Sequence, residues 1–186
     1  MTGAASESLY RTGGTVLLIK VPEAEPVVGT WRGQFDPAAA AGVPAHITVL
    51  GPFLDRSLTD AGVMGELDAL IGEHQPFDIE LAECARFPGV LYLAPMPAAP
   101  FRALTGAIAE RWPEAPPYEG QFSDVVPHLT VAYGQEPEVL DMIEPEVTGR
   151  LPVAARIEAV QLMTYTGEHW EDVRTFLLGG GQRQVR

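Results

Sequence analysis

Two short stretches carry most of the information in this chain: PAHITVLG at residues 44–51 and VPHLTVAYG at residues 126–134. Each has a proline one or two residues before a His-apolar-Thr-Val segment, and each ends on a glycine. A single His-x-Thr is common by chance, whereas two copies in matching contexts are not. Residues i and i+2 of a β-strand lie on the same face. Each copy therefore predicts a strand that presents its histidine and threonine side by side.

His46 and Thr48 share one predicted strand face, as do His128 and Thr130. If the two strands meet across a pseudo-twofold axis, both imidazoles face one cleft. Histidine titrates near neutral pH, so one imidazole can be a general base while the other, protonated, is a general acid. The threonine hydroxyls can donate hydrogen bonds to phosphoryl oxygens as charge develops there. This set of side chains suits displacement at phosphorus, and the scheme needs no metal ion.

A less specific interpretation exists for each of these residues. A strand histidine can be a core residue that is hydrogen-bonded to a neighbouring strand, and threonine is a good strand former. For either histidine alone, this interpretation would be favoured. The matched pair of motifs favours the catalytic interpretation instead.

Hydrophobic periodicity and turn residues predict alternating strands and helices along the chain. Strands are expected at residues 14–21, 45–50, 77–87, 90–93, 128–133, 154–165 and 173–178. Helices are expected at residues 23–34, 59–74, 101–112 and 138–146, the last one shortened by Pro145. Loops are expected at residues 35–44, 115–120 and 166–172. The second half repeats the β-α-β-β portion of the first, which indicates an α+β fold of two lobes with small, mainly antiparallel sheets.

Composition narrows the classes of partner and location. The chain has 186 residues and a net charge of −13, Lys20 is its only lysine, and no run of basic residues occurs. Long nucleic acids are therefore disfavoured, because they bind mainly through neutralised phosphates, but a local pocket can still accept a small anion. Cys84 is the only cysteine, which excludes an internal disulfide and a cysteine-based zinc site. We find neither a membrane-length apolar run nor a signal peptide, so we expect a cytoplasmic protein without a membrane anchor.

Other polar residues are weaker candidates. His169 lies among acidic residues, but their spacing matches no common metal site, so we expect a solvated hairpin tip. Trp112 and Trp170 are expected to be packing residues. Three arginines could each reach a phosphate, although surface positions are the more frequent outcome for this residue type: Arg86, Arg102 and Arg174.

The paired motifs resemble the H-x-[ST]-x signatures of the 2H phosphoesterase superfamily, which includes bacterial 2′-5′ RNA ligases and cyclic phosphodiesterases. Residues 87–95 (FPGVLYLAP) resemble its central strand pair, and Trp170 with residues 174–179 (RTFLLG) resembles its closing strand. The resemblance spans residues 15–179. It implies a bilobal fold with a central cleft, and hydrolysis of cyclic phosphates or 2′-5′ linkages without a cofactor. Some members of the superfamily also catalyse the reverse reaction, ligation without ATP, so the resemblance implies this activity as a further possibility.

The resemblance also implies roles for individual residues. His46 and His128 correspond to the catalytic pair, and Thr48 and Thr130 to the phosphate binders. Tyr133 lies where some cyclic phosphodiesterases carry an aromatic that contacts substrate. Strict alternation turns Tyr133 away from the cleft, so this contact requires a bend in the chain near the glycine that follows it.

The sequence thus predicts a single bilobal domain over residues 14–178, between a flexible N-terminus at residues 1–13 and a flexible tail at residues 179–186. Our leading hypothesis is a monomeric, metal-independent phosphodiesterase for a 2′,3′-cyclic phosphate or a related small nucleotide. The alternatives are a 2′-5′ RNA ligase or RNA-end processing enzyme, and a non-catalytic domain that binds a nucleotide or a protein.

Overall fold

Two four-stranded antiparallel sheets form the framework of the protein, in a computed structural model that describes residues 10–120 and 125–180. Sheet A has the strand order β2 (His46–Leu50), β1 (Thr15–Lys20), β7 (Ala159–Tyr165) and β8 (Trp170–Leu177). Sheet B has the order β5 (Leu129–Tyr133), β4 (Val90–Met96), β3 (Phe77–Phe87) and β6 (Val153–Ile157). The predicted α+β class with two antiparallel sheets is confirmed. Most of the two terminal segments for which flexibility is predicted lies outside the described residues.

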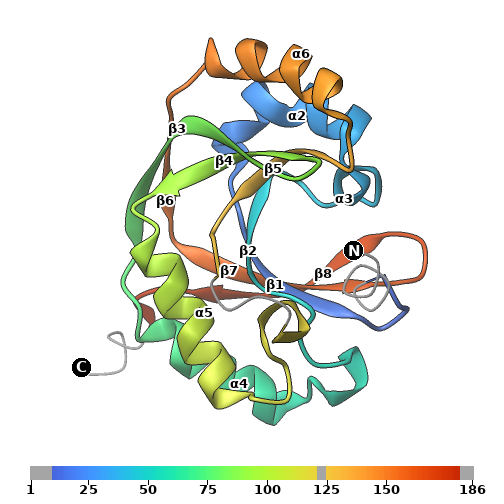
Figure 1. The fold of residues 1–186 in the computed structure, drawn as a ribbon. Coiled ribbons are helices and arrows are strands. Elements are labelled where there is room, and N and C mark those ends of the chain that lie inside the picture. Colours follow the sequence, from blue (N-terminus) through green and yellow to red (C-terminus); the bar gives the residue numbers. More distant parts are fainter. Residues whose placement is uncertain (1–9, 121–124, 181–186) are drawn as a thin grey trace.

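Four longer helices cover one face of each sheet (Figure 1). Sheet B is covered by α2 (Glu25–Phe35) and α6 (Pro137–Thr148), and sheet A by α4 (Ala61–Gly72) and α5 (Ala99–Arg111). A short helix, α3 (Pro37–Ala40), lies within the segment for which the sequence predicts a loop, because Asp36 caps its N-terminus and Pro37 begins its first turn. Single 3-10 turns occur at Pro22–Ala24, Arg56–Leu58 and Pro117–Gly120. Within the described parts of the chain, every helix is too short or too polar to cross a membrane.

Two of these helices are exchanged between the sheets. Helix α2 connects β1 to β2 of sheet A but packs on β5 of sheet B, and α5 connects β4 to β5 but packs on β2 (Figure 1). As a result, residues of both sheets belong to one continuous hydrophobic core, in which Ile47 and Leu129 are both fully buried. Burial of apolar surface on this scale dominates folding, so the core fixes the two sheets relative to each other.

The single strand predicted at residues 154–165 is wrong. The structure has two strands there, β6 in sheet B and β7 in sheet A, with Glu158 between them. Residues 153, 155 and 157 are buried, and then 160 and 162, so the two-residue period of the strand shifts by one at this crossing. That shift of period is the sequence signal for a chain that passes from one sheet to the other.

Two further boundaries differ from the prediction. Pro145 does not shorten α6, which continues to Thr148, because Val147 in the last turn is fully buried with Leu140 and Ile143 on one helix face. Strand β8 begins at Trp170, and the predicted hairpin loop therefore contracts to residues 166–169.

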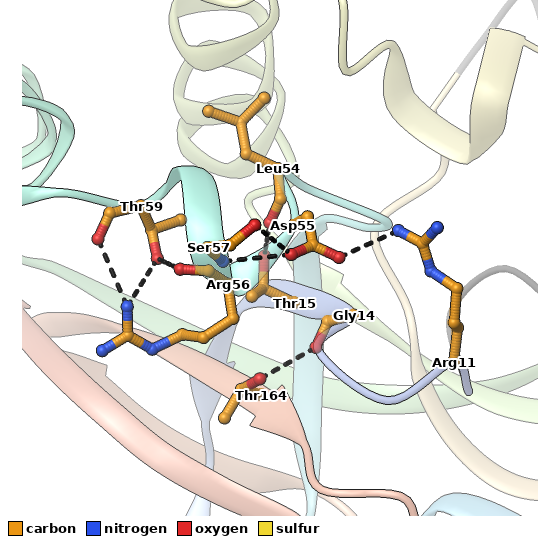
Figure 2. Close-up of polar contacts among 9 residues, drawn as sticks. All are labelled: Arg11, Gly14, Thr15, Leu54, Asp55, Arg56, Ser57, Thr59 and Thr164. Carbon is orange, nitrogen blue, oxygen red and sulfur yellow. Dashed lines mark hydrogen bonds and ion pairs between the residues drawn. The ribbon is translucent and has the colours of Figure 1, made fainter.

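Residues 54–57, which follow β2, are connected by hydrogen bonds and an ion pair to the beginning of β1 and the segment before it (Figure 2). The buried Thr15 hydroxyl donates to the Leu54 carbonyl at 2.6 Å. Asp55 accepts from the Ser57 amide and hydroxyl and pairs with Arg11 at 3.0 Å. These local bonds hold the carboxyl end of β2, and with it the end of the first His-x-Thr motif.

Candidate active site

The two His-x-Thr motifs lie on neighbouring edge strands, β2 of sheet A and β5 of sheet B. Their apolar second residues are fully buried beneath the helices. His46 and Thr48, and likewise His128 and Thr130, are only partly buried, as expected for the opposite strand face. This face points away from the covering helices and toward the other sheet. The contact between β2 and β5 therefore places the two motifs side by side, with His128 close enough to influence His46.

Both histidines make the same hydrogen bond. His46 Nδ1 lies 2.8 Å from the Pro44 carbonyl, and His128 Nδ1 lies 2.8 Å from the Val126 carbonyl. A carbonyl oxygen only accepts, so Nδ1 must carry the proton in each ring. In the neutral form Nε2 is then an unprotonated acceptor on each imidazole. Among the described residues, neither Nε2 atom has a hydrogen-bond partner.

Burial changes the acid–base properties of the pair. Desolvation by the surrounding protein lowers the pKa of His46 to about 3, Arg32 and the neighbouring His128 act in the same direction, and the bond to Pro44 opposes them. Burial also lowers the pKa of His128, and its bond to the Val126 carbonyl opposes that shift. Both imidazoles are thus neutral at neutral pH in the free protein and can accept a proton.

A β-bulge follows the threonine of each motif. Thr48 pairs with Leu18 and Leu50 pairs with Leu17, so Val49 has no partner. In the second motif Thr130 pairs with Tyr92 and Ala132 with Leu91, which leaves Val131 as the extra residue. Bulges re-aim the side chains of a strand and are frequent beside active sites. The repeated bulge extends the likeness of the two motifs from sequence to backbone geometry.

The bulge also decides where Tyr133 lies. Tyr133 pairs with Val90 of β4, one residue out of step with Thr130, so it returns to the face that carries His128. The prediction that it would need a bend near Gly134 is wrong, because the bulge at Val131 does this instead. Tyr133 is 37% exposed and lines an open groove with Phe35, Asp36 and Pro37. Gly51 holds the equivalent position of the first motif.

Different side chains surround the two histidines. The His128 ring lies edge-on to Phe87 and Tyr92, with ring centroids 5.3 and 5.5 Å away. Lys20 is the cross-strand neighbour of His46, and its ammonium pairs with Asp172 of β8 at 2.6 Å. Aromatic rings therefore border the His128 imidazole, whereas the ion-paired Lys20 lies beside His46.

Arg32 on α2 is a site residue that the sequence analysis missed. Its side chain is 1% exposed and donates to the Thr130 carbonyl at 2.9 Å, and to the Val43 and Pro44 carbonyls at 3.0 and 3.2 Å. It also forms an ion pair with Asp36 at 2.8 Å. The sequence did contain a signal for this role. Arg32 follows Val28 by four residues, on the apolar stripe of the predicted helix, and Asp36 follows Arg32 by another four.

The other candidate arginines do not join the motifs. Arg86 pairs with Asp141 and Glu144 of α6, on the helix-covered side of sheet B. Arg174 pairs with Asp68 of α4 at 3.5 Å. Arg102 donates to the Val125 carbonyl, three residues before His128, and its guanidinium has no other recorded partner among the described residues.

The remaining candidates lie outside the site. His169 is exposed and contacts Glu171 at 2.9 Å, and among the described residues no cluster of three or more His, Cys, Asp or Glu side chains has the arrangement of a metal site. Trp112 and Trp170 are buried, as predicted for packing residues.

The sequence profile of the 2′-5′ RNA ligase superfamily matches residues 21–169, a span that contains both motifs and most of both sheets. The chain belongs to this superfamily. Among curated protein sequences, none matches the chain.

Solved structures agree with this family in fold. E. coli LigT complexed with 3′-AMP is 16% identical, with a TM-score of 0.60 over 90% of this chain and 99% of that chain. The protein TT0787 of Thermus thermophilus is 17% identical, with a TM-score of 0.57 over 90% of this chain and 98% of that chain. Usb1 of Kluyveromyces marxianus is 13% identical, with a TM-score of 0.50 over 90% of this chain and 99% of that chain. At these identities the likeness establishes a LigT-like fold for this 2H phosphoesterase superfamily chain.

Proposed function

We propose that this protein is a metal-independent phosphodiesterase that hydrolyses a 2′,3′-cyclic phosphate or a related small nucleotide. One observation carries the proposal. Two histidines, one at the beginning of edge strand β2 and one directly before the neighbouring edge strand β5, both have Nδ1 fixed by a backbone carbonyl, which leaves Nε2 of each ring free for proton transfer. Paired groups of this kind supply the general base and the general acid that hydrolysis requires.

In the proposed reaction one imidazole Nε2 takes a proton from water, and the water oxygen forms a bond to phosphorus. The bond from phosphorus to one ribose oxygen breaks, and the other histidine, protonated at Nε2, gives its proton to that oxygen. A bound phosphate anion favours the protonated form of a neighbouring imidazole, which offsets the effect of burial. The reaction therefore needs one proton on the pair and no redox partner or second substrate besides water.

Thr48 and Thr130 are proposed to bind the phosphate. Each lies two residues after its histidine on the same strand face, and among the described residues neither hydroxyl has a recorded hydrogen-bond partner. Hydroxyls in such positions can donate to the non-bridging oxygens, where negative charge increases in the transition state.

Several observations favour a small substrate. LigT has been crystallised with 3′-AMP, with ATP and with NADP+, which are nucleotides or dinucleotides. The net charge of −13 opposes binding of long RNA or DNA. Tyr133 and the groove beside it lie next to the second motif, and we propose that this tyrosine contacts the nucleoside part of the substrate. In that case Tyr133→Leu raises KM with little change in kcat.

The direct test incubates the purified protein with 2′,3′-cyclic nucleotides, 2′-5′-linked dinucleotides and cyclic-phosphate-ended oligonucleotides in the presence of EDTA. We expect turnover of the cyclic nucleotides that EDTA does not reduce. Loss of activity in EDTA with recovery on adding a divalent ion would disprove the metal-independent mechanism.

The same panel separates the alternatives. Joining of RNA ends with a 2′-5′ linkage, together with salt-dependent tRNA binding, would identify a ligase or RNA-end enzyme. Nucleotide binding without turnover of any phosphodiester would identify a non-catalytic binding domain.

A further inference from the structure

Arg32 connects the two catalytic motifs through their backbones. One guanidinium donates to the Thr130 carbonyl in the second motif and to the Pro44 carbonyl two residues before the first. The Pro44 carbonyl is also the acceptor for His46 Nδ1. Glu25 on the same helix accepts from the Ala45 amide at 2.6 Å, so α2 holds the chain on both sides of that peptide unit. A displacement of Arg32 would therefore change both the distance between the two motif strands and the orientation of the His46 ring.

Stability alone does not account for a charge in this position. Arg32 and Asp36 are both buried, at 1% and 7% exposure. Removing two charges from water carries a large desolvation penalty, and apolar residues of similar size usually stabilise a core as well or better. A retained buried ion pair calls for a reason other than packing, and the three backbone carbonyls that Arg32 reaches suggest one.

Arg32 is placed differently with respect to the two histidines. It donates to the Pro44 carbonyl, which also accepts from His46 Nδ1, whereas the acceptor of His128 Nδ1, the Val126 carbonyl, is not one of the three carbonyls that Arg32 reaches. Its positive charge also lowers the pKa of His46. The other titratable groups near the first motif are Glu25, Asp36, His128 and Lys20, and the ammonium of Lys20 is paired with Asp172. At the corresponding contact of the other exchanged helix, the uncharged Thr105 of α5 donates to the Val49 carbonyl at 2.7 Å.

We propose that Arg32 is a positioning residue that sets the spacing of the two His-x-Thr strands and makes the histidines unequal, so that the first proton taken up goes to His128. The expected effect of Arg32 on turnover rests on the proposed function. The inequality of the two imidazoles is a property of the free protein and can be measured without any substrate.

The first measurement follows the histidine ring protons by NMR as the pH is lowered, with signals assigned from His46→Ala and His128→Ala. In the unmodified protein His128 is expected to titrate at a higher pH than His46. Equal titration of the two rings, or the reverse order, would overturn the inference without reference to any Arg32 variant.

The second measurement uses Arg32→Gln combined with Asp36→Asn, which removes the ion pair without leaving a buried carboxylate unpaired. The titration of His46 is expected to move up by about 1 pH unit, and that of His128 to move much less. Arg32→Lys keeps the charge but lacks the planar fork of donors, so the His46 titration is expected to stay close to that of the unmodified protein.

Turnover supplies the readout for spacing. Arg32→Lys is expected to lower kcat by about 10²-fold, because a small displacement of the reacting groups has an effect of this size. Thr105→Val is the matched control, since it removes a buried bond to the other motif strand without changing charge, and it should leave kcat and both titrations nearly unchanged. An equal loss of kcat in both variants would contradict the assignment. Absence of phosphodiesterase activity in the unmodified protein would refute the proposed function, while the titrations would still decide the role of Arg32.

Discussion

The two His-x-Thr motifs agree closely on the side that faces the site and differ on the side that faces the helices. Each histidine donates from Nδ1 to the carbonyl two residues earlier at 2.8 Å, and each threonine precedes a bulged valine. On the helix side, the buried Arg32–Asp36 ion pair lies where α2 meets the motif strands, whereas the neutral hydroxyl of Thr105 links α5 to β2. The chemistry requires two similar imidazoles, whereas acid–base catalysis requires them to differ in protonation. The helix side can supply that difference without altering the motif itself.

The largest effect is expected from the histidines, and it tests how far the motifs are equivalent. His46→Ala and His128→Ala should each lower kcat by about 10²–10⁴-fold, because each removes a proton-transfer group. Steady-state kinetics on a 2′,3′-cyclic nucleotide, with thermal unfolding as the check on folding, provides the measurement. His169→Ala, on the exposed hairpin, is the control. A variant of either motif histidine with a near-normal rate would show that the motifs are not an acid–base pair.

The next effect separates the two helix contacts by stability. Arg32→Gln should lower the free energy of unfolding by about 3–5 kcal/mol, because it leaves the Asp36 carboxylate buried without its partner. Thr105→Val should lower it by about 1 kcal/mol, the usual size for one neutral hydrogen bond. Urea unfolding with a common m-value gives both numbers. Equal losses would mean that the ion pair is no more important to the fold than the hydroxyl.

The threonines compare the phosphate-binding halves of the motifs. Thr48→Val and Thr130→Val keep the shape of the side chain and remove the hydroxyl, and each is expected to lower kcat by about 10²-fold as a transition-state donor is lost. Thr→Ser at the same positions should retain most of the rate. A fall in substrate affinity with an unchanged kcat would show that the hydroxyls bind the ground state and the transition state equally.

The smallest effect is a pH dependence of stability. Because burial lowers the pKa of His46 to about 3 and also lowers that of His128, the unfolded chain takes up protons below pH ~6.5 that the folded chain excludes. Stability should therefore fall as the pH decreases from about 6.5, by at most about 1.4 kcal/mol per pH unit for each histidine. Urea unfolding between pH 7 and pH 5 measures it. His46→Asn should reduce this slope and His169→Asn should not, and an unchanged slope in His46→Asn would show that His46 is not protected from protonation.

Much of the site could be predicted because its information is local. A strand of period two is enough to put His46 beside Thr48, and repetition of the motif is enough to pair His46 with His128. Strict alternation turns Tyr133 away from the cleft, whereas the bulge at Val131 returns it to the face of His128. The consecutive buried residues Val131 and Ala132 carry the signal, as do Val49 and Leu50 in the first motif.

The remaining features depend on contacts that no local pattern encodes. Arg32 belongs to a helix of the first half, yet it reaches the Thr130 carbonyl 98 positions away in the chain. A hydrophobic pattern identifies the buried stripe of α2 but not which sheet that stripe will cover. The passage of the chain from β6 to β7 was missed for the same reason, since an extended segment of strand formers looks alike whether it serves one sheet or two.

The exchange of strands and helices between the sheets has a consequence for the chain as a whole. A cut in the turn at Pro88 and Gly89 would divide it into two pieces, and neither piece would contain a complete sheet. The first would hold β1 and β2 without β7 and β8, and the second would hold β4, β5 and β6 without β3. Two such fragments should be unfolded apart and should recover the native structure only when mixed, so the two lobes are products of one folding event rather than units that fold and then dock.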